Sequence, residues 1–170
     1  MAVTIQSIHI LLVGEHALVR AGLRLLLDSR PGLHVVAEAA PDADALTAAT
    51  CESPDIILLD LDLALDRHGP GALTLIPDLR ACAPQARVLL LTAVHDPQIH
   101  SPAVHVGVMG LVWKDSEPAE IWNAVEKVYM GEVWLGRMLM ASVLSTMTCR
   151  ATWRSNVRAR ISRQRRSFRI

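Results

Sequence analysis

Short apolar runs alternate with longer amphipathic segments along most of this chain. Each run has four to six residues, a length that suits a strand and is short for a helix. Nearly continuous apolar character is typical of parallel strands that are buried on both faces. The run before Asp60 also fits a segment of a buried helix, and its pattern alone leaves both structures open. The predicted strands are residues 8–13, 33–37, 56–59, 87–92 and 108–113.

The segments between these runs predict helices. In residues 17–30 the apolar positions recur at helical spacing and share the face that is expected to pack on the sheet. These positions are Leu18, Val19, Gly22, Leu23, Leu26 and Leu27. The other predicted helices are residues 42–51, 71–83, 97–106 and 119–130.

Local signals mark several helix ends. Pro41 and Asp42 are start signals for the helix of residues 42–51. Ser116 is a residue type that caps helix N-termini, and Pro118 suits a first turn. Gly131 suits the residue after a last turn. Pro77 falls inside a predicted helix, where proline shortens or kinks the helix.

The alternation of strands and helices predicts an α/β domain. Strands joined by helices form parallel sheets with right-handed crossovers and helices on both faces. We therefore expect a doubly wound, five-stranded parallel sheet of the flavodoxin-like kind over residues 8–132. Residues 133–148 predict a C-terminal linker helix, and residues 149–170 predict an Arg-rich, disordered basic tail.

The distribution of charge separates this tail from the rest of the chain. Residues 1–149 hold all 17 acidic residues and 9 of the basic ones, a net charge of −8, whereas residues 150–170 hold 8 arginines and no acid. A block of like charges favours a solvated tail. Because Trp153, Val157 and Ile161 lie four apart, a basic amphipathic helix remains the alternative. Any nucleic-acid binding by this tail would be electrostatic and sensitive to salt.

Composition excludes several classes of protein. No run of 18 apolar residues marks a membrane helix, and residues 1–7 lack the pattern of a secretory signal. The three cysteines are an odd number without metal-ligand spacing, which favours reduced thiols in the cytoplasm. The seven histidines also lack ligand spacing and are expected to be structural or exposed. Without a Gly-rich phosphate loop, a nucleophile elbow or a dinucleotide fingerprint, we expect no metabolic reaction and no small-molecule substrate.

Polar side chains follow four of the predicted strands. Glu15 follows the first, Asp60 ends the third, Thr92 ends the fourth and Lys114 follows the fifth. Because the carboxyl ends of parallel strands meet at one edge, where α/β proteins bind ligands, we expect these four side chains to lie together. Each also has a structural interpretation, as a cap or turn residue for the first three and as a solvated charge for Lys114.

These residues lie in motifs that resemble the receiver domain of two-component response regulators, in the NarL/FixJ (LuxR-type) branch. The resemblance covers roughly residues 8–132. Each motif alone is a weak signal, whereas the ordered set with this spacing is specific. The motifs are ILLVGEHALVRAGL at 10–23, PDIILLDL at 54–61, LLTA at 90–93 and GLVWKD at 110–115.

The resemblance implies a phosphoacceptor site. Asp60 would accept a phosphoryl group from a phosphohistidine of a sensor histidine kinase, and Thr92 and Lys114 would contact the phosphoryl oxygens. Glu15, Asp60 and the backbone carbonyl of Asp62 would hold Mg²⁺, which neutralises charge during phosphoryl transfer. The resemblance also implies a role in transcription regulation and leaves a homodimer open. Enzymatic activity would be limited to self-catalysed phosphorylation and dephosphorylation of the aspartate.

Two single residues and one segment depart from the family pattern. Gly14 stands where the family has the first of two adjacent acids, so Mg²⁺ is expected to bind weakly. Residues 63–71 replace the Met-Pro-Gly segment that usually follows the acceptor, and Leu111 replaces an aromatic residue that commonly responds to the threonine. Gly14 and Leu111 support an alternative function, a pseudo-receiver that acts in protein interaction or dimerisation without phosphate.

The segment after the receiver bears on DNA binding. In this branch a helix-turn-helix domain normally follows, and its second helix enters the major groove. Only 22 residues follow Thr148, too few for that module, so DNA binding through it is not expected. A further alternative is a DNA-binding regulator that acts through the Arg-rich tail. A shifted reading frame would also produce such a tail.

Overall fold

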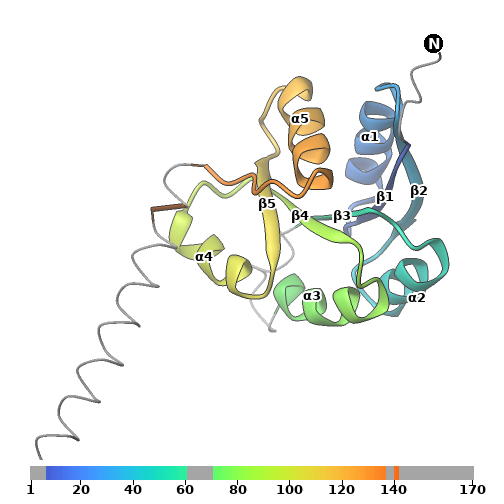
Figure 1. Ribbon diagram of the computed structural model, residues 1–170, viewed down its shortest axis with the longest axis horizontal. Coiled ribbons are helices and arrows are strands. Elements are labelled where there is room, and N and C mark those ends of the chain that lie inside the picture. Colours follow the sequence, from blue (N-terminus) through green and yellow to red (C-terminus); the bar gives the residue numbers. More distant parts are fainter. Residues whose placement is uncertain (1–6, 61–70, 137–139, 142–170) are drawn as a thin grey trace, which may run out of the picture.

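The structure, a computed structural model, describes residues 7–60, 71–136, 140 and 141. Five strands and five helices alternate along this part of the chain, as Figure 1 shows. The strands are β1 (Ile8–Val13), β2 (Leu33–Ala39), β3 (Ile56–Asp60), β4 (Arg87–Thr92) and β5 (Val108–Trp113). The helices are α1 (Ala17–Asp28), α2 (Ala43–Glu52), α3 (Gly71–Cys82), α4 (Pro97–His105) and α5 (Pro118–Tyr129).

The strands form one parallel sheet in the order β2-β1-β3-β4-β5. From β1 the chain first moves outward to β2, and it then crosses back to place β3 on the other side of β1. The order therefore reverses between β1 and β3, which is the topological switch point where open α/β sheets bind ligands. The predicted doubly wound, flavodoxin-like fold is confirmed.

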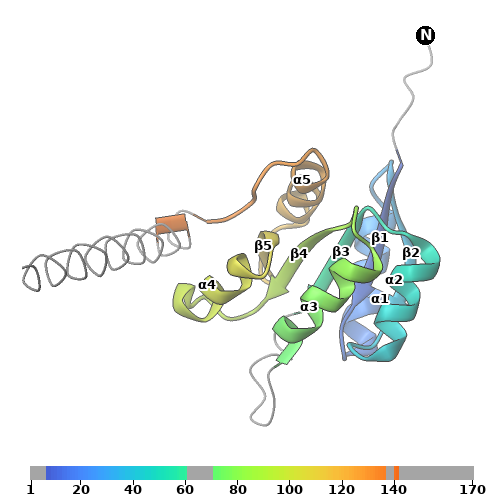
Figure 2. The ribbon, with the colours of Figure 1, turned by 60° about the horizontal axis from the view of Figure 1, so that its bottom comes forward.

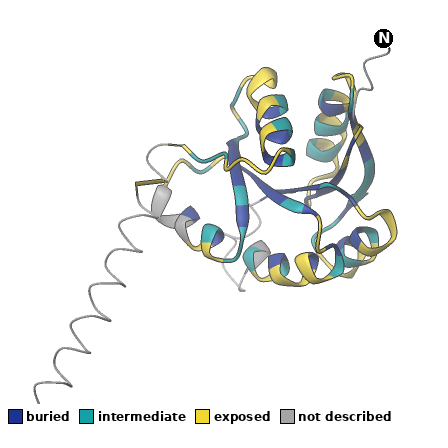
Figure 3. Ribbon diagram, in the orientation of Figure 1, coloured by how far each residue is buried: buried dark blue, intermediate teal, exposed yellow. Residues whose placement is uncertain are grey.

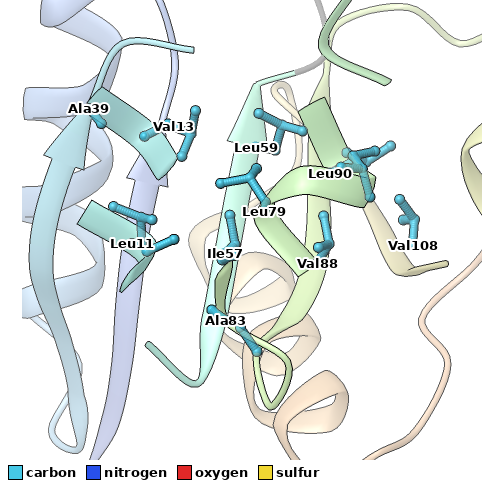
Figure 4. Packing of buried hydrophobic residues seen from close by; sticks show 14 of the residues in the cluster. Leu11, Val13, Ala39, Ile57, Leu59, Leu79, Ala83, Val88, Leu90 and Val108 are labelled. Atoms are coloured by element: carbon cyan, nitrogen blue, oxygen red, sulfur yellow. The ribbon is translucent and has the colours of Figure 1, made fainter. Parts of the chain in front are cut away.

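Helices cover both faces of the sheet. Helices α1 and α5 lie on one face, while α2, α3 and α4 lie on the other (Figures 1 and 2). On the first face, the indole nitrogen of Trp122 in α5 donates a hydrogen bond of 3.0 Å to the carbonyl oxygen of Leu26 in α1. On the second face, Leu79 of α3 packs with Ile57 and Leu59 of β3 (Figure 4). The sheet is therefore the middle of three layers.

Burial explains why the strands have continuous apolar sequences. All five residues of β3 are buried, including Asp60 at its end, and the helices are exposed on their outer sides (Figure 3). Alternate residues of β3 belong to different cores: Ile57 and Leu59 pack toward α2 and α3, and Ile56 and Leu58 pack toward α1 and α5. The helical alternative for this run is wrong.

The predicted element bounds agree closely with the structure. Strands β1, β4 and β5 have the predicted ends, and β2 extends two residues further than predicted, to Ala39. Asp42, a predicted start signal, is the N-cap of α2, since its carboxylate accepts a 2.9 Å hydrogen bond from the amide of Asp44. Ser116 does not cap α5, because the helix begins at Pro118 and Glu117 occupies the N-cap position without a side-chain hydrogen bond.

Two leucines of α1 face away from the core. Leu27 is buried as predicted, but Leu18 is 86% exposed and Leu25 is 76% exposed. Leu18 and Leu25 are seven residues apart and share a helix face, which lies opposite to Leu27. The assignment of Leu18 to the packed face is therefore wrong, and so is that of Gly22, which is also exposed.

The segment after α5 is not a helix at its start. Gly131 ends the helix region with a φ of +89°, a conformation that glycine adopts without strain. Trp134 then pairs with the free edge of β5: its amide donates to the carbonyl of Met109 (2.9 Å), and its carbonyl accepts from the amide of Leu111 (2.8 Å). The predicted linker helix over residues 133–148 is therefore absent at 133–136, although 140 and 141 are helical.

Two further predictions concern the Arg-rich tail and the absence of a membrane-spanning helix. The Arg-rich tail, residues 149–170, lies outside the described residues. None of the helices in the described ranges has the length and apolar character that crossing a membrane requires.

Candidate functional site

The carboxyl edge of the sheet brings together the polar residues that the sequence singles out. Asp60 ends β3 beside Leu91 of β4, and Thr92 ends β4 opposite Trp113 of β5. Lys114 directly follows β5. On the other side of β3, Val13 of β1 pairs with Leu59, so Gly14 and Glu15 continue past the same edge.

Asp60 and Lys114 form the central ion pair of the site. The ammonium nitrogen Nζ of Lys114 lies 2.8 Å from Oδ2 of Asp60. The aspartate side chain is only 4% exposed and that of the lysine 22%. A carboxylate is stable at such depth only with charged or hydrogen-bonding partners, and the ammonium is one of these. The amide of Lys114 also donates to the carbonyl of Thr92 (2.8 Å), which fixes where the lysine leaves the sheet.

Thr92 is fully buried at the end of β4. Its hydroxyl oxygen accepts a 3.1 Å hydrogen bond from the amide of Val94, two residues along the loop between β4 and α4. A threonine hydroxyl has one hydrogen to donate and two lone pairs to accept with. It therefore has the chemistry to donate to an anionic oxygen that arrives beside Asp60.

Gly14 leaves little space between β1 and the aspartate. A Cβ atom added at Gly14 would lie 3.2 Å from Cβ of Asp60 and 3.7 Å from its Oδ2. It would also lie 3.8 Å from Cγ of Arg20. The first distance is shorter than ordinary van der Waals contact, so a side chain here requires a small displacement of β1 or β3. A side chain at this position would therefore lie beside the carboxylate of Asp60.

Arg20 secures the loop that carries Glu15. From the second turn of α1 its guanidinium reaches back and donates to the carbonyl oxygens of Gly14 and Glu15, the latter at 3.1 Å. Its Nε lies 3.6 Å from Oε2 of Glu38 in β2. Sequence reasoning missed this residue, although Arg20 falls inside the first family-like motif.

Glu38 links this arginine to a second one. Nη1 of Arg24 lies 2.8 Å from Oε1 of Glu38, and the Nε of Arg24 lies 3.5 Å from Asp28 one turn along α1. The hydrogen bond to Glu38 raises the pKa of the Arg24 guanidinium above its ordinary value. The two arginines share one carboxylate, so Glu38 holds Arg20 in the orientation that reaches the loop.

The donor set favours a hard cation but is small. Asp60 is a buried carboxylate at the edge, and Glu15 is exposed in the loop after β1. Asp62, the third predicted ligand, lies outside the described residues. No group of three or more His, Cys, Asp or Glu side chains able to hold a metal occurs in the described part of the chain. Oxygen donors without thiol or imidazole fit Mg²⁺, which keeps several water ligands in most protein sites.

Two histidines join an aromatic cluster next to this edge. His95 stacks on Trp113 with ring centroids 4.3 Å apart, and His100 meets the same indole edge-on at 5.7 Å. His100 is fully buried, and Nε2 of His95 lies 3.1 Å from Oδ2 of Asp115. The expectation that such histidines are structural or exposed holds for both, but their spacing along the chain does not indicate that they gather around one tryptophan.

Comparison with known proteins assigns the family. Residues 10–126 match the family model described as the response regulator receiver domain. This chain belongs to that family. The matched range contains the site residues from Gly14 to Lys114.

Several curated relatives are response regulators or transcriptional regulators by name. Response regulator UvrY from Escherichia coli K12 is 28% identical over 128 residues, which cover 75% of this chain and 57% of the relative. Response regulator protein VraR from Staphylococcus epidermidis is 35% identical over 127 residues, or 74% of this chain and 58% of the relative. Transcriptional regulatory protein LiaR from Bacillus subtilis is 28% identical over 140 residues, 82% and 64% respectively. The chain thus spans less than two thirds of the length of each.

Solved structures agree. A LuxR-family two-component response regulator from Aurantimonas sp. has a TM-score of 0.71 and 31% identity, covering 84% of this chain and 99% of that one. The signal receiver domain of the response regulator NarL from Mycobacterium tuberculosis has a TM-score of 0.65 and 29% identity, covering 75% of this chain and 99% of that domain. These matches place the described residues in the receiver fold of the NarL/LuxR branch.

Proposed function

We propose that this receiver domain accepts a phosphoryl group on Asp60 from a sensor histidine kinase. The observation that carries the proposal is the buried Asp60 carboxylate held 2.8 Å from Lys114 at the switch point of the sheet, with the hydroxyl of Thr92 ending the neighbouring strand. This combination supplies a nucleophile, a fixed positive charge and a hydroxyl donor on adjacent strands.

The transfer step follows from these groups. A carboxylate oxygen of Asp60 forms a bond to the phosphorus of a phosphohistidine while the nitrogen–phosphorus bond breaks, and the imidazole leaves with its electron pair and takes up a proton. The product is an acyl phosphate. Lys114 offsets the negative charge on the phosphoryl oxygens, and Thr92 donates a hydrogen bond to one of them. The lysine must release part of its present contact with Asp60 to do so.

Mg²⁺ is the proposed cofactor. Receiver domains generally bind this ion at the phosphorylation site. In this chain Asp60 and Glu15 would hold it, with the carbonyl of Asp62 and water completing the shell. When bound, the ion supplies charge neutralisation for the transferring phosphoryl group. Since Gly14 provides no carboxylate, we expect an affinity below that of a receiver with two adjacent acids.

The proposed partner kinase would approach over the start of α1. Helix α1 begins two residues after Glu15, so its first turn borders the site. Leu18 in that turn is 86% exposed and lies on the same face as Leu25. An exposed apolar side chain beside the acceptor is a suitable contact for the protein that carries the phosphohistidine. We further propose that the chain acts in the cytoplasm and in transcription regulation, the second because the similar LiaR is named a transcriptional regulatory protein.

A second candidate function is supported by Gly14. The missing acid favours a pseudo-receiver, which would signal through protein interaction or dimerisation without phosphate. DNA binding by the chain itself is proposed for neither function. The two candidates differ in one measurable step, the covalent modification of Asp60.

The deciding experiment is incubation of the full chain with Mg²⁺ and a small phosphodonor such as phosphoramidate, followed by intact mass measurement. We expect one added phosphoryl group on the wild type and none on Asp60→Asn. Asp78→Asn, which changes an exposed carboxylate on α3, is the matched control and should be modified like the wild type. No uptake by a folded wild type in the presence of saturating Mg²⁺ would favour the pseudo-receiver.

A further inference from the structure

The residue opposite Thr92 on the neighbouring strand is Trp113. The two residues are register partners at the ends of β4 and β5. Position 111, where the branch commonly has an aromatic residue, holds a leucine that is 4% exposed and packs in the core. Since alternate residues of a strand point to the same face, Leu111 and Trp113 share a face of the sheet. The aromatic side chain nearest to Thr92 in register is therefore two residues later than expected.

The loop after Thr92 is held by two side chains that act on one peptide. The amide of Val94 donates to the hydroxyl of Thr92 (3.1 Å), and the carbonyl of Val94 accepts a hydrogen bond from Nε2 of His100 in α4. A carbonyl only accepts, so His100 carries its hydrogen on Nε2. Among the described residues, Nδ1 of this buried histidine has no hydrogen-bond partner. His100 therefore serves the loop through a single bond.

The same histidine touches Trp113, and so does a second one from the loop. His100 meets the indole edge-on, and His95, one residue after Val94, stacks on it at an interplanar angle of 25°. Trp113, His95 and His100, which we name the Trp113 cluster, thus connect the end of β5 to the loop that follows Thr92 and to helix α4. The contacts form a closed path: Thr92 to Val94, Val94 to His100, and His100 to Trp113, which lies opposite Thr92.

We propose that the Trp113 cluster carries the response of Thr92 to phosphate on Asp60, with His100 as the positioning residue that couples the loop to the indole. This inference rests on the proposed function and specifies its regulation. It assigns to Trp113 the response to Thr92 that an aromatic residue at position 111 would otherwise provide. Leu111 cannot provide it, because an aliphatic side chain has no ring to stack on the histidines and no polar group to bond to the loop.

The physical basis is a rotation of the Thr92 side chain. In the present arrangement its hydroxyl oxygen accepts from the amide of Val94, and a phosphoryl group on Asp60 offers an anionic oxygen to which the same hydroxyl can donate. Hydrogen bonds to charged groups are stronger than neutral ones, so the side chain rotates toward the phosphoryl oxygen, and its own oxygen moves away from the amide of Val94. The Val94 peptide then loses one of its two side-chain partners, and the loop that bears His95 shifts relative to Trp113.

The change would reach the protein surface. Thr92 and His100 are fully buried, whereas the side chain of His95 is 54% exposed and Trp113 is partly exposed. A movement of the buried Thr92 would therefore change how His95 and Trp113 are arranged at the surface, on the α4 side of the sheet. Two arrangements of the loop after Thr92 are thus in equilibrium, one with and one without a hydrogen bond from Thr92 to a phosphoryl group. Phosphorylation favours the first arrangement, because only that arrangement contains the phosphoryl–Thr92 hydrogen bond.

Fluorine NMR of the full chain labelled with 5-fluorotryptophan tests this inference. The chain has four tryptophans, and a Trp→Phe variant of each assigns its signal. Mg²⁺ with beryllofluoride, a phosphate mimic, is then added. The same spectrum shows the fluorine signal of protein-bound beryllofluoride and the signal of Trp113. We expect both a bound beryllofluoride signal and a displaced Trp113 signal. Trp122, which packs on the opposite face of the sheet against α1, should keep its position.

Variants of His100 separate coupling from folding. In His100→Leu, beryllofluoride should still bind while the displacement of the Trp113 signal is lost. In His100→Gln, whose amide donates a hydrogen bond like Nε2, the displacement of the Trp113 signal should return. If His100→Leu does not fold, the displacement in His100→Gln alone tests whether this hydrogen bond couples the loop to Trp113. Bound beryllofluoride with an unmoved Trp113 signal in the wild type, or an equal displacement of Trp113 and Trp122, would overturn the inference. Absence of bound beryllofluoride would instead refute the proposed phosphoacceptor function.

Discussion

Nζ of Lys114 lies 2.8 Å from Oδ2 of Asp60, and the carboxylate is almost completely removed from water. Replacing Lys114 by methionine keeps the aliphatic stem but leaves the buried charge without its ammonium. We expect the free energy of unfolding to fall by about 1–3 kcal/mol, since a buried polar group that loses its partner costs that much. Phosphorylation by a small donor should also slow. Urea unfolding and the rate of phosphoryl uptake measure the two effects.

A matched ion pair provides the control for this prediction. Lys127 lies 2.9 Å from Glu132, but both side chains are at least half exposed. Exposed pairs of this kind contribute roughly 0.2–1 kcal/mol. Lys127→Met should therefore change stability less than Lys114→Met and leave phosphorylation unaffected. Equal losses in the two variants would contradict the importance of burial at the site.

Magnesium binding should respond to a carboxylate at position 14. Gly14→Asp adds an oxygen ligand beside Asp60, so we expect tighter Mg²⁺ binding, measured by calorimetry. The added Cβ would lie 3.2 Å from Cβ of Asp60, and the strands must separate slightly, so some stability should be lost.

Gly14→Ala isolates this steric cost. It introduces the same Cβ without the carboxylate, so it should lose similar stability and gain no affinity for Mg²⁺. Binding in Gly14→Asp that is no tighter than in Gly14→Ala would argue against a metal site next to Asp60.

The strands and the site edge were predictable because they depend on patterns that parallel topology imposes. The run before Asp60 is apolar at every position because both of its faces are covered, and β3 is buried throughout. Once five strands alternate with helices, their carboxyl ends must share an edge, so Lys114 and Asp60 are expected to meet although 54 residues separate them.

The remaining features depend on tertiary geometry that a pattern does not contain. Leu18 and Leu27 are equally apolar, and only the rotation of α1 on the sheet decides which one is buried. The reach of Arg20 to the loop carbonyls depends on where Glu38 lies in β2. Trp134 belongs to a segment with helical composition, and its pairing with β5 follows from the open edge of that strand.

Arg20 should influence the site without touching its reacting atoms. Arg20→Ala removes two hydrogen bonds to the carbonyls of Gly14 and Glu15. Because the loop that carries Glu15 then loses its anchor, we expect Mg²⁺ affinity to fall roughly tenfold, the smaller loss typical of removing a group that orients a metal ligand. Arg24→Ala breaks another contact to the same Glu38 but none to the loop, so its Mg²⁺ affinity should match the wild type. Calorimetric titration of the two variants tests the distinction.

Leu18 should matter for transfer from a kinase and not for transfer from a small donor. Leu18→Asp places a charge on the exposed face of α1 beside the site, so phosphotransfer from the cognate kinase should slow severalfold, since the kinase contact is disrupted. Uptake from phosphoramidate should be unchanged. Met130→Asp, which alters another exposed apolar residue just after α5, is the matched control. Equal slowing with both donors would mean that the substitution disturbs the site itself.

The charge distribution predicts that the Arg-rich tail is dispensable for folding. Deleting residues 150–170 removes eight positive charges from a chain whose remaining part carries a net charge of −8. Attractions between exposed charges are weak and screened by salt, so the thermal unfolding midpoint should change little. If the full chain binds nucleic acid, binding should disappear with the tail and weaken with salt, with a log–log slope of about −0.9 per phosphate contacted on duplex DNA. A large loss of thermal stability on truncation would show that the tail packs on the receiver. Sequence-specific binding that resists salt would show that a segment of the chain contacts the edges of the DNA bases. Such contacts, and not charge alone, carry sequence specificity.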